Sequence, residues 1–276
     1  MAKAASRALD LSPPYRGEIA DAYATPGLLA LLAEPRKLFD DPQTEILFEG
    51  RNRLGALKIT AGPAGTMEVV VKEYHSPGIE KLKSRFQPSK AAKAWNGACA
   101  LLSEGFETPV PVAFLEKRKG RFVEQSFFIA ERLGGACEIR HLFRDVSRMN
   151  LRPLLAALAS TLFRLHEKGI VHRDLSDGNV LVKAGAGEFH FFFLDTNRIR
   201  RGRRTSAAAR AANLVRLGIP PALRLFFLER YAEAGSRPLR RAFVVWYQLN
   251  KSVYTGWIKF KKMLRLKKLA RRLKVQ

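Results

Sequence analysis

Alternation of apolar and polar positions predicts a sheet in the first half of the chain. Short apolar or β-branched runs are separated by turns that contain glycine or proline, a pattern typical of strands with one buried face. The expected strands lie at residues 45–50, 56–60, 67–74, 110–116 and 122–130. A helix over about 89–103 is expected between the third and fourth strands. We therefore expect a small antiparallel sheet with one helix packed on it.

The second half reads as mainly helical. Leucines recur at helical spacing over 153–168, and Gly169 follows as a C-terminal cap. Two short strands are expected next, at about 179–182 and 189–195. Three helices follow, at about 206–217, 221–234 and 238–274. This half should form a helical lobe with a few short strands.

These patterns divide the chain into four expected segments. Residues 1–44 read as an N-terminal arm, partly helical at 27–34. Residues 45–132 form a small lobe, residues 133–256 a mainly helical lobe, and residues 257–276 a basic amphipathic helix. The fold class is α+β with two lobes.

Composition excludes several broad classes. The chain has 276 residues and 47% hydrophobic content, enough to bury a core. Cys99 and Cys137 are too few for a disulfide framework and lack metal-ligand spacing, so we expect buried thiols in a reducing cytoplasm. The N-terminus has no apolar signal region, and no run of about 18 apolar residues predicts a membrane span.

The positive charge is concentrated in the last third of the chain. The net charge is +24, and residues 196–276 hold 22 Lys and Arg against only two acids, Glu229 and Glu233. Such asymmetry favours an anionic partner, which can be a phosphorylated glycolipid, an anionic membrane or a nucleic acid. Nucleic acid is the least favoured of the three.

Four residues suggest phosphoryl transfer. Asp174 lies in the segment HRDLSDGN at 172–179, Asn179 follows five positions later, and Asp195 ends an apolar strand. Lys72 lies in the strand VVVKEY. Protein kinases use a strand lysine, a loop aspartate, an asparagine and a metal-binding aspartate in this order, to hold ATP and Mg²⁺. Each residue alone is more often structural, but their joint order predicts a two-lobed, protein-kinase-like fold.

Three segments resemble the lipopolysaccharide core kinases, the Kdo/WaaP family. They are LHEKGIVHRD at 165–174, FLDTNRIR at 193–200 and SKAAKAWNGACALLSEGFETPVPVA at 89–113. The resemblance implies transfer of the ATP γ-phosphate to a sugar hydroxyl of the lipopolysaccharide inner core, on heptose or Kdo. It also implies a cytoplasmic enzyme peripheral to the inner membrane of a Gram-negative bacterium.

The resemblance assigns roles position by position. Asp174 is the catalytic base, and Asn179 and Asp195 are the metal ligands. Lys72 contacts the ATP phosphates, and Glu131 lies at the hinge near adenine. Gly50 and Gly55 frame the phosphate loop, so they complete the expected cofactor-binding set.

Three departures from the family pattern qualify these roles. Ala94 stands where a helix Glu is expected to pair with Lys72, and Glu80 and Glu104 are alternative partners. The loop GRNRLG at 50–55 is an incomplete glycine motif, in which Arg51 or Arg53 would compensate. Asp195-Thr196-Asn197 replaces the usual metal-loop triplet. A non-catalytic, membrane-bound pseudokinase is therefore an alternative to an active enzyme.

The basic C-terminal segments leave further alternatives open. Residues 257–274 contain no acid and carry an apolar stripe on a helix, the profile of a helix that lies on an anionic membrane. The same stripe would equally suit packing on the helical lobe. The run RIRRGRRT at 198–205 is either a phosphate contact or a solvated loop. The catalytic-loop pattern also resembles the RIO-like atypical kinases or ATPases, which would act with RNA.

Overall fold

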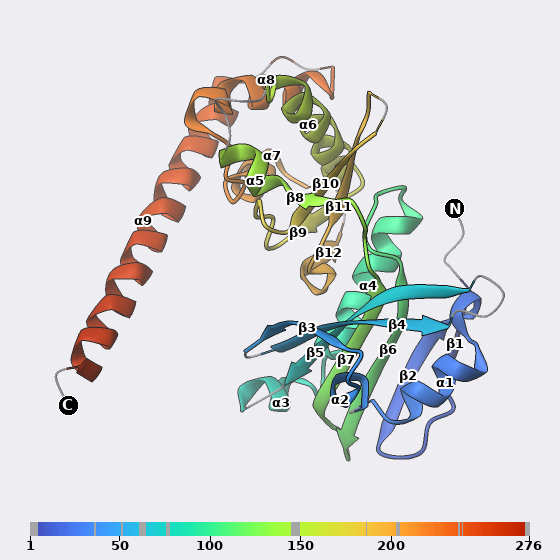
Figure 1. Ribbon diagram of the computed structural model, residues 1–276. Coiled ribbons are helices and arrows are strands. Elements are labelled where there is room, and N and C mark those ends of the chain that lie inside the picture. The colour runs from blue at the N-terminus through green and yellow to red at the C-terminus, as the bar shows by residue number, and fades with distance from the viewer. Residues whose placement is uncertain are drawn as a thin grey trace. The chain divides into compact units, whose positions relative to one another are not determined.

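The computed structural model divides into two compact units (Figure 1). The first comprises Met1–Cys137 and Leu181–Arg200, and the second Glu138–Val180 and Arg201–Gln276. The described residues are 5–35, 37–50, 52–60, 65–75, 78–144, 150–185, 187–202, 205–236, 238 and 240–273, without the side chains of 60, 79, 80 and 265–273.

A seven-stranded antiparallel sheet forms the centre of the first unit. Its order is β1-β2-β6-β7-β5-β4-β3. The strands are β1 Ser6–Ala8, β2 Tyr15–Ala20, β3 Glu45–Glu49, β4 Asn52–Thr60, β5 Thr66–His75, β6 Pro111–Lys119 and β7 Phe122–Glu131. Sequentially adjacent strands are mostly neighbours, and β5 between β4 and β7 is a central strand.

Helices cover both faces of this sheet. Helices α1 (Pro26–Ala33) and α2 (Lys37–Asp40) contribute leucines and Phe39 to a core that includes alternate residues of the central strands. Helix α4 (Lys90–Ser103) buries Ala91, Ala92 and Trp95 against other strand residues. The remaining elements wholly within the unit are η1 Asp21–Tyr23, α3 Ile79–Lys83, β11 Phe189–Phe193 and η3 Thr196–Arg198. Because successive side chains of a strand point to opposite faces, the sheet buries residues on both of its faces, under α1 and α2 on one and under α4 on the other.

The five strands expected from the sequence are confirmed, but the sheet is larger than expected. Strands β1 and β2 lie within residues 1–44, which the sequence pattern assigns to an arm. Only two residues of β2, Ile19 and Ala20, are fully buried, so its apolar alternation is weak. Strand β4 begins at Asn52 rather than at residue 56 and takes in most of the expected phosphate loop.

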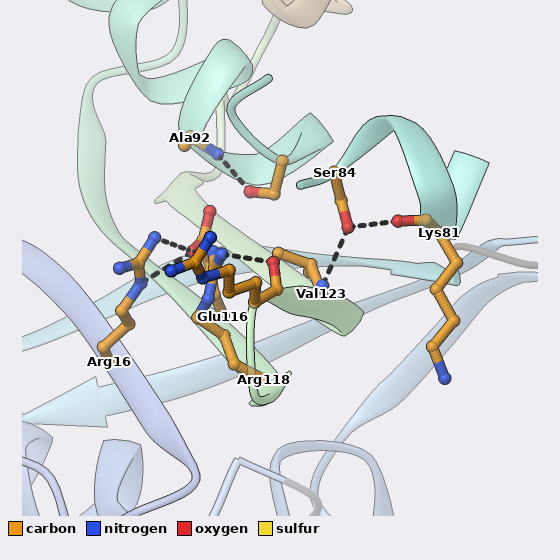
Figure 2. A network of polar contacts seen from close by, with 9 residues as sticks. Arg16, Lys81, Ser84, Ala92, Glu116, Arg118 and Val123 are labelled. Atoms are coloured by element: carbon orange, nitrogen blue, oxygen red, sulfur yellow. Dashed lines mark hydrogen bonds and ion pairs between the residues drawn. The ribbon is translucent and has the colours of Figure 1, made fainter. Parts of the chain in front are cut away.

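An ionic network around the buried carboxylate of Glu116 joins three elements of the first unit (Figure 2). The carboxylate of Glu116 on β6 accepts hydrogen bonds from Arg16 Nε at 2.9 Å and from Arg118 Nη1 at 2.7 Å. Burial alone would raise the pKa of Glu116, but hydrogen bonds from Ser89, Arg118 and Arg16 outweigh it and lower that pKa. Ser89 also caps α4 by accepting from the Ala92 amide. The network therefore fixes the N-terminal end of α4 on the sheet.

The second unit is mainly helical, as expected. It contains α5 Ile139–Arg144, α6 Arg152–Glu167, β9 Ile170–His172, α7 Ala207–Leu214, η4 Pro221–Leu223, α8 Arg224–Glu233 and α9 Arg241–Leu273. Helix α6 packs on α8, and α7 packs on α9. The short elements β8 (Cys137–Glu138), β10 (Val180–Ala184) and β12 (Ile199–Arg201) lie where the chain passes from one unit to the other.

A buried histidine connects the helices of the second unit. His166 Nδ1 lies 2.7 Å from the Tyr231 hydroxyl, and Nε2 lies 3.0 Å from Asn213 Oδ1. Asn213 Nδ2 in turn donates to the carbonyl of His172, the first residue of the HRD segment. His166 is fully buried, and burial lowers its pKa to about 4. The neutral imidazole thus holds α6, α7 and α8 together next to the HRD segment.

Acid should destabilise the protein through His166. Between about pH 6.5 and pH 4 the unfolded imidazole binds a proton that the folded one excludes, so the free energy of unfolding falls as the pH falls. The loss should approach about 3 kcal/mol. Urea unfolding at several pH values gives the free energy of unfolding at each pH. Between pH 4 and pH 6.5 this free energy should change less with pH for His166→Gln than for the wild type. The same pH dependence in both proteins would contradict a role for His166 in acid destabilisation.

The exposure of the two cysteines corrects one expectation. Cys99 is half-buried, but Cys137 is exposed, so the prediction of two buried thiols is wrong for Cys137. It lies at the end of the first unit, where the chain leaves the sheet. Among the described residues, no helix has the length and apolar character needed to cross a membrane.

Candidate active site

The first unit contains a largely apolar cavity of about 280 Å³ whose wall includes four charged residues, Lys72, Glu131, Arg132 and Asp195. Leu54, Val70 and Phe128 from the sheet and Leu181 and Leu194 from the later strands supply apolar surface. Lys72, Asp195 and Glu131 also line it. We call it the Lys72 cavity. Three of the residues predicted for cofactor or metal binding therefore share one cavity.

Strand register explains why Lys72 faces this cavity. In β5 the odd-numbered residues Val69 and Val71 enter the core beneath α1 and α2, so Val70 and Lys72 face the opposite side. Lys72 pairs with Leu54 of β4 and with Phe128 of β7. Directly opposite residues share a face, so both side chains flank the lysine. The alternation of VVVKEY thus places one ammonium group on an apolar surface.

Lys72 forms an ion pair with Asp195. Asp195 follows strand β11 and adopts the left-handed conformation with φ 54°, which only a few non-glycine residues favour. This turn directs its carboxylate back towards β5. Burial, and secondarily the charge of Asp195, raise the pKa of Tyr74, so this neighbour remains a neutral phenol. The cavity therefore holds one cation and one carboxylate in contact.

The packing of α4 shows how the turn after Asp195 is held. Thr196 Oγ1 donates to the Ala94 carbonyl at 2.8 Å, so the Ala94 backbone supports the turn at the helix position where the resemblance predicts Glu. A Cβ on Gly97 would lie 2.1 Å from the Thr196 carbonyl oxygen. The small residues of α4 therefore allow direct contact with Thr196. Glu104, an alternative partner for Lys72, is the C-cap residue of α4, and the Glu80 side chain lies outside the described residues.

Replacing Gly97 with alanine should destabilise the protein. A helical Gly→Ala change normally stabilises by about 1 kcal/mol, but here the added Cβ overlaps the Thr196 backbone. We expect a loss of about 1–3 kcal/mol in the free energy of unfolding. The matched control is Asn96→Ala, which changes the exposed residue immediately before Gly97 on α4. Urea unfolding that gives equal values for both variants would contradict this packing argument.

Glu131 lies at the end of β7 with a partner that sequence reasoning missed. The Tyr23 hydroxyl donates to Glu131 Oε1 at 2.5 Å. Burial and this hydrogen bond raise the pKa of Tyr23. Tyr23 comes from the first 44 residues, whose contribution to the cavity has no recognisable motif. The arm thus helps to position the residue expected near adenine.

The two glycines of the expected phosphate loop lie away from the cavity wall. Gly55 is inside β4, pairs with Val71 and faces Phe39 and Thr44 on the opposite side of the sheet. Gly50 is the bend between β3 and β4, close to the ring of Phe48. Arg51 lies outside the described residues. The nucleotide-binding roles of Gly50 and Gly55 stay predictions.

The HRD segment of the second unit forms a compact loop. The Asp174 amide donates to His172 Nδ1 at 3.1 Å, and Asn179 Nδ2 donates to the Asp174 carbonyl at 2.8 Å. His172 and Leu175 are completely buried, whereas Arg173 is exposed. Asp174 and Asn179 are therefore held in one loop by bonds across the five-residue spacing read from the sequence.

Arg216 is the functional candidate that the motifs did not reveal. Its Nη1 donates to Asp174 Oδ1 at 2.5 Å and fixes the orientation of the carboxylate. The guanidinium also lies 5.6 Å from the centre of the Tyr254 ring on α9. Arg216 is one of many basic residues in the last third, and only the fold distinguishes it from solvated charges.

The arrangement supplies oxygen ligands suited to a hard cation. Because Asn179 Nδ2 is committed to a carbonyl, its Oδ1 is the atom left to accept or coordinate. Carboxylate and amide oxygens are typical Mg²⁺ ligands. Within the described residues, no group of three His, Cys, Asp or Glu side chains is arranged for a metal.

Comparisons with known proteins identify the family. The model of the lipopolysaccharide kinase (Kdo/WaaP) family matches residues 69–220, more than half of the chain. A structure of WaaP in complex with acyl carrier protein matches with a TM-score of 0.57 and 20% identity, over 79% of this chain and 91% of that chain. The bifunctional kinase-methyltransferase WbdD matches with a TM-score of 0.43 and 16% identity, over 73% of this chain and 42% of that chain.

Comparison with curated proteins found no match. The family match includes Lys72, Asp174, Asn179 and Asp195, and the WaaP structure has the same fold. The chain therefore belongs to the lipopolysaccharide kinase (Kdo/WaaP) family and has a protein-kinase-like α+β fold.

Proposed function

We propose that this kinase transfers the γ-phosphate of ATP, with Mg²⁺, to a sugar hydroxyl of the lipopolysaccharide inner core, on heptose or Kdo. The observation that carries the proposal is the Lys72–Asp195 ion pair in the wall of an apolar cavity. A planar base fits between apolar side chains, and a lysine at the same cavity can contact phosphates.

Glu131 is the proposed contact on the adenine side. It ends β7, lines the Lys72 cavity and is oriented by Tyr23. Lys72 is the proposed contact to the phosphates. When nucleotide binds, its ammonium would contact both the phosphates and Asp195, in place of the usual helix glutamate at position 94. Because Asp195 can thus replace the helix glutamate as the partner of Lys72, the absence of Glu at position 94 does not require a pseudokinase, and the ion pair supports an active enzyme.

Asp195 and Asn179 are the proposed metal ligands, through carboxylate and amide oxygens. Mg²⁺ there would neutralise charge on the phosphates. Because the two residues belong to different units, the proposal requires that the units bring them together around the nucleotide. Asp174 is the proposed base. Arg216 engages Oδ1, so Oδ2 is the atom that would accept the proton of the sugar hydroxyl.

Phosphate transfer from labelled ATP to purified core glycolipid tests the function. The wild type with Mg²⁺ should label the glycolipid, and Asp174→Ala with an unchanged circular dichroism spectrum should not. ATP binding without transfer to any core glycolipid would favour the pseudokinase. Preferential labelling or co-purification of RNA would instead favour the RIO-like alternative.

Helix α9 is proposed to hold the enzyme on the anionic cytoplasmic face of the inner membrane. In Figure 1 it extends beyond the other helices of its unit. Six exposed apolar side chains recur every three or four residues along it: Trp246, Leu249, Val253, Trp257, Phe260 and Leu264. Lysines flank this stripe, and the sequence has no acid after Glu233. A second copy would bring like charges together, so an anionic lipid surface is the better partner.

Replacing stripe residues should weaken membrane binding. Val253→Gln and Trp257→Gln should each reduce affinity for phosphatidylglycerol vesicles by roughly tenfold, since each removes an exposed apolar side chain that would enter the lipid on binding. Trp246 and Trp257 are half exposed, and their fluorescence should shift to the blue on binding. Phe86→Gln, which changes an exposed apolar residue of the first unit away from α9, is the matched control. Equal affinity of all variants would contradict the proposal.

A further inference from the structure

A second cavity, of about 790 Å³, lies between α8 and α9 in the second unit. On α9 its wall consists of residues spaced three or four apart, including Tyr247, Lys251, Thr255 and Lys259. Arg224, at the start of α8, faces it from the other side. We call it the α8–α9 cavity. It uses a face of α9 different from the exposed apolar stripe.

The charged residues in the wall of the α8–α9 cavity carry positive charge. Among the described residues that line it, Arg224, Lys251 and Lys259 are charged and none is acidic. Lys251 Nζ donates to the carbonyls of Val215 at 2.6 Å and Leu217 at 3.2 Å. An ammonium group has three N–H donors, so a third is left for another acceptor. Arg224 Nε donates to the Ile219 carbonyl, and this bond does not use the N–H groups of the two terminal nitrogens, which can donate to a ligand.

The electrostatics of Lys251 indicate that an anion would be stabilised there. Burial, and then the charge of Arg224, lower the pKa of Lys251, whereas Asp177 opposes that shift. Two cations that disfavour each other are each stabilised by an anion between them. Asp177 is the neighbouring acid, and it does not line the cavity.

A buried hydroxyl without a partner gives independent support. Tyr247 is only 2% exposed, yet within the described part of the chain its hydroxyl has no hydrogen-bond partner. A buried hydroxyl usually finds one, because an unpaired buried hydroxyl loses its hydrogen bonds to water without replacement. Tyr247 lines the α8–α9 cavity, so a bound oxyanion would supply the missing acceptor.

From these observations we propose that the α8–α9 cavity binds a phosphate group, as a second site separate from the Lys72 cavity. Arg224 and Lys251 neutralise it, and the Tyr247 hydroxyl donates to it. The phosphate belongs either to a membrane lipid headgroup or to a soluble phosphorylated sugar or metabolite. The site does not depend on the phosphotransfer proposed above. Lys251 also contacts both neighbours of Arg216, so occupancy can influence the residue that orients Asp174.

Calorimetric titration with inorganic phosphate and with glycerol 3-phosphate tests the site. All variants are made in a Lys72→Gln background, so that phosphate binding at the Lys72 cavity does not contribute. Arg224→Gln should weaken binding by roughly tenfold, and Tyr247→Phe by several-fold. The charge-matched control Lys261→Gln, on the same helix outside the cavity, should stay within about twofold.

Tyr247→Phe separates a ligand role from a structural one. Because the hydroxyl is unpaired, its removal should leave the free energy of unfolding without phosphate unchanged or higher. The same variant should show a smaller stabilisation by phosphate. A destabilised Tyr247→Phe protein with wild-type phosphate affinity would overturn the proposal, as would equal affinities of Arg224→Gln and Lys261→Gln.

A vesicle arm identifies the source of the phosphate. If it is a lipid headgroup, Arg224→Gln should lose more affinity for phosphatidylglycerol vesicles than Lys261→Gln, with no binding to phosphatidylcholine. If it is soluble, the two variants should bind vesicles equally while glycerol 3-phosphate still distinguishes them. Either result supports the site. Asp174→Asn should retain phosphate binding in every arm, so failure of the catalytic proposal is read separately.

Discussion

Asp174→Asn should lower kcat for transfer to core glycolipid by about a thousandfold, while ATP affinity changes little. Asparagine keeps the shape of the side chain and can still accept the hydrogen bond from Arg216, but it cannot take the proton of the sugar hydroxyl. The base therefore disappears without loss of the loop. Steady-state transfer of labelled phosphate at saturating ATP measures the effect.

A surface carboxylate provides the control for this result. Asp40→Asn changes an exposed residue at the end of α2 by the same chemistry and should leave kcat unchanged. Thermal unfolding should give similar midpoints for both variants and the wild type. Wild-type kcat in a folded Asp174→Asn enzyme would eliminate Asp174 as the base.

Asp195→Asn should lower kcat by at least roughly a hundredfold and raise the Mg²⁺ concentration needed for half-maximal rate. Loss of even an outer-shell partner of a metal often costs that much, and Asp195 is the proposed ligand itself. Asparagine is also among the residues that best tolerate the left-handed conformation at φ 54°, so the backbone should persist. Rate against Mg²⁺ concentration measures both effects.

Loss of the Lys72–Asp195 ion pair in Asp195→Asn should change the stability of the protein little. Both side chains are more than one-fifth exposed, and such ion pairs contribute about 1 kcal/mol or less. Asp195→Asn should therefore unfold near the wild-type temperature. A variant with wild-type Mg²⁺ dependence would show that Asp195 is not a metal ligand, whatever its rate.

The sequence predicted the elements whose apolar pattern was strong. The strand VVVKEY, the helix after Ser89 and the leucine-rich helix α6 all lie within a residue or two of their expected limits. Their periodicity reflects burial on one face or stripe, which a single chain reveals directly. The same alternation correctly placed Lys72 on a face of its strand, and strand register explains its apolar neighbours.

Other features depend on contacts between segments distant in sequence. Strand β2 is half polar and pairs with β6 across about a hundred residues, so its own pattern does not reveal it. Arg216 orients Asp174, and Tyr23 orients Glu131, with no motif connecting either pair. Ala94 illustrates the converse, because a departure from the family pattern coincides with a contact through its backbone carbonyl to Thr196. Only the fold reveals such partners.

Mass spectrometry of core glycolipid tests the proposed function most directly. Cells that carry the wild-type gene or only the Asp174→Asn variant would be compared. One phosphate on a heptose or Kdo residue should be present with the wild type and absent with the variant. Identical phosphorylation in both strains would contradict phosphate transfer by this enzyme to the inner core.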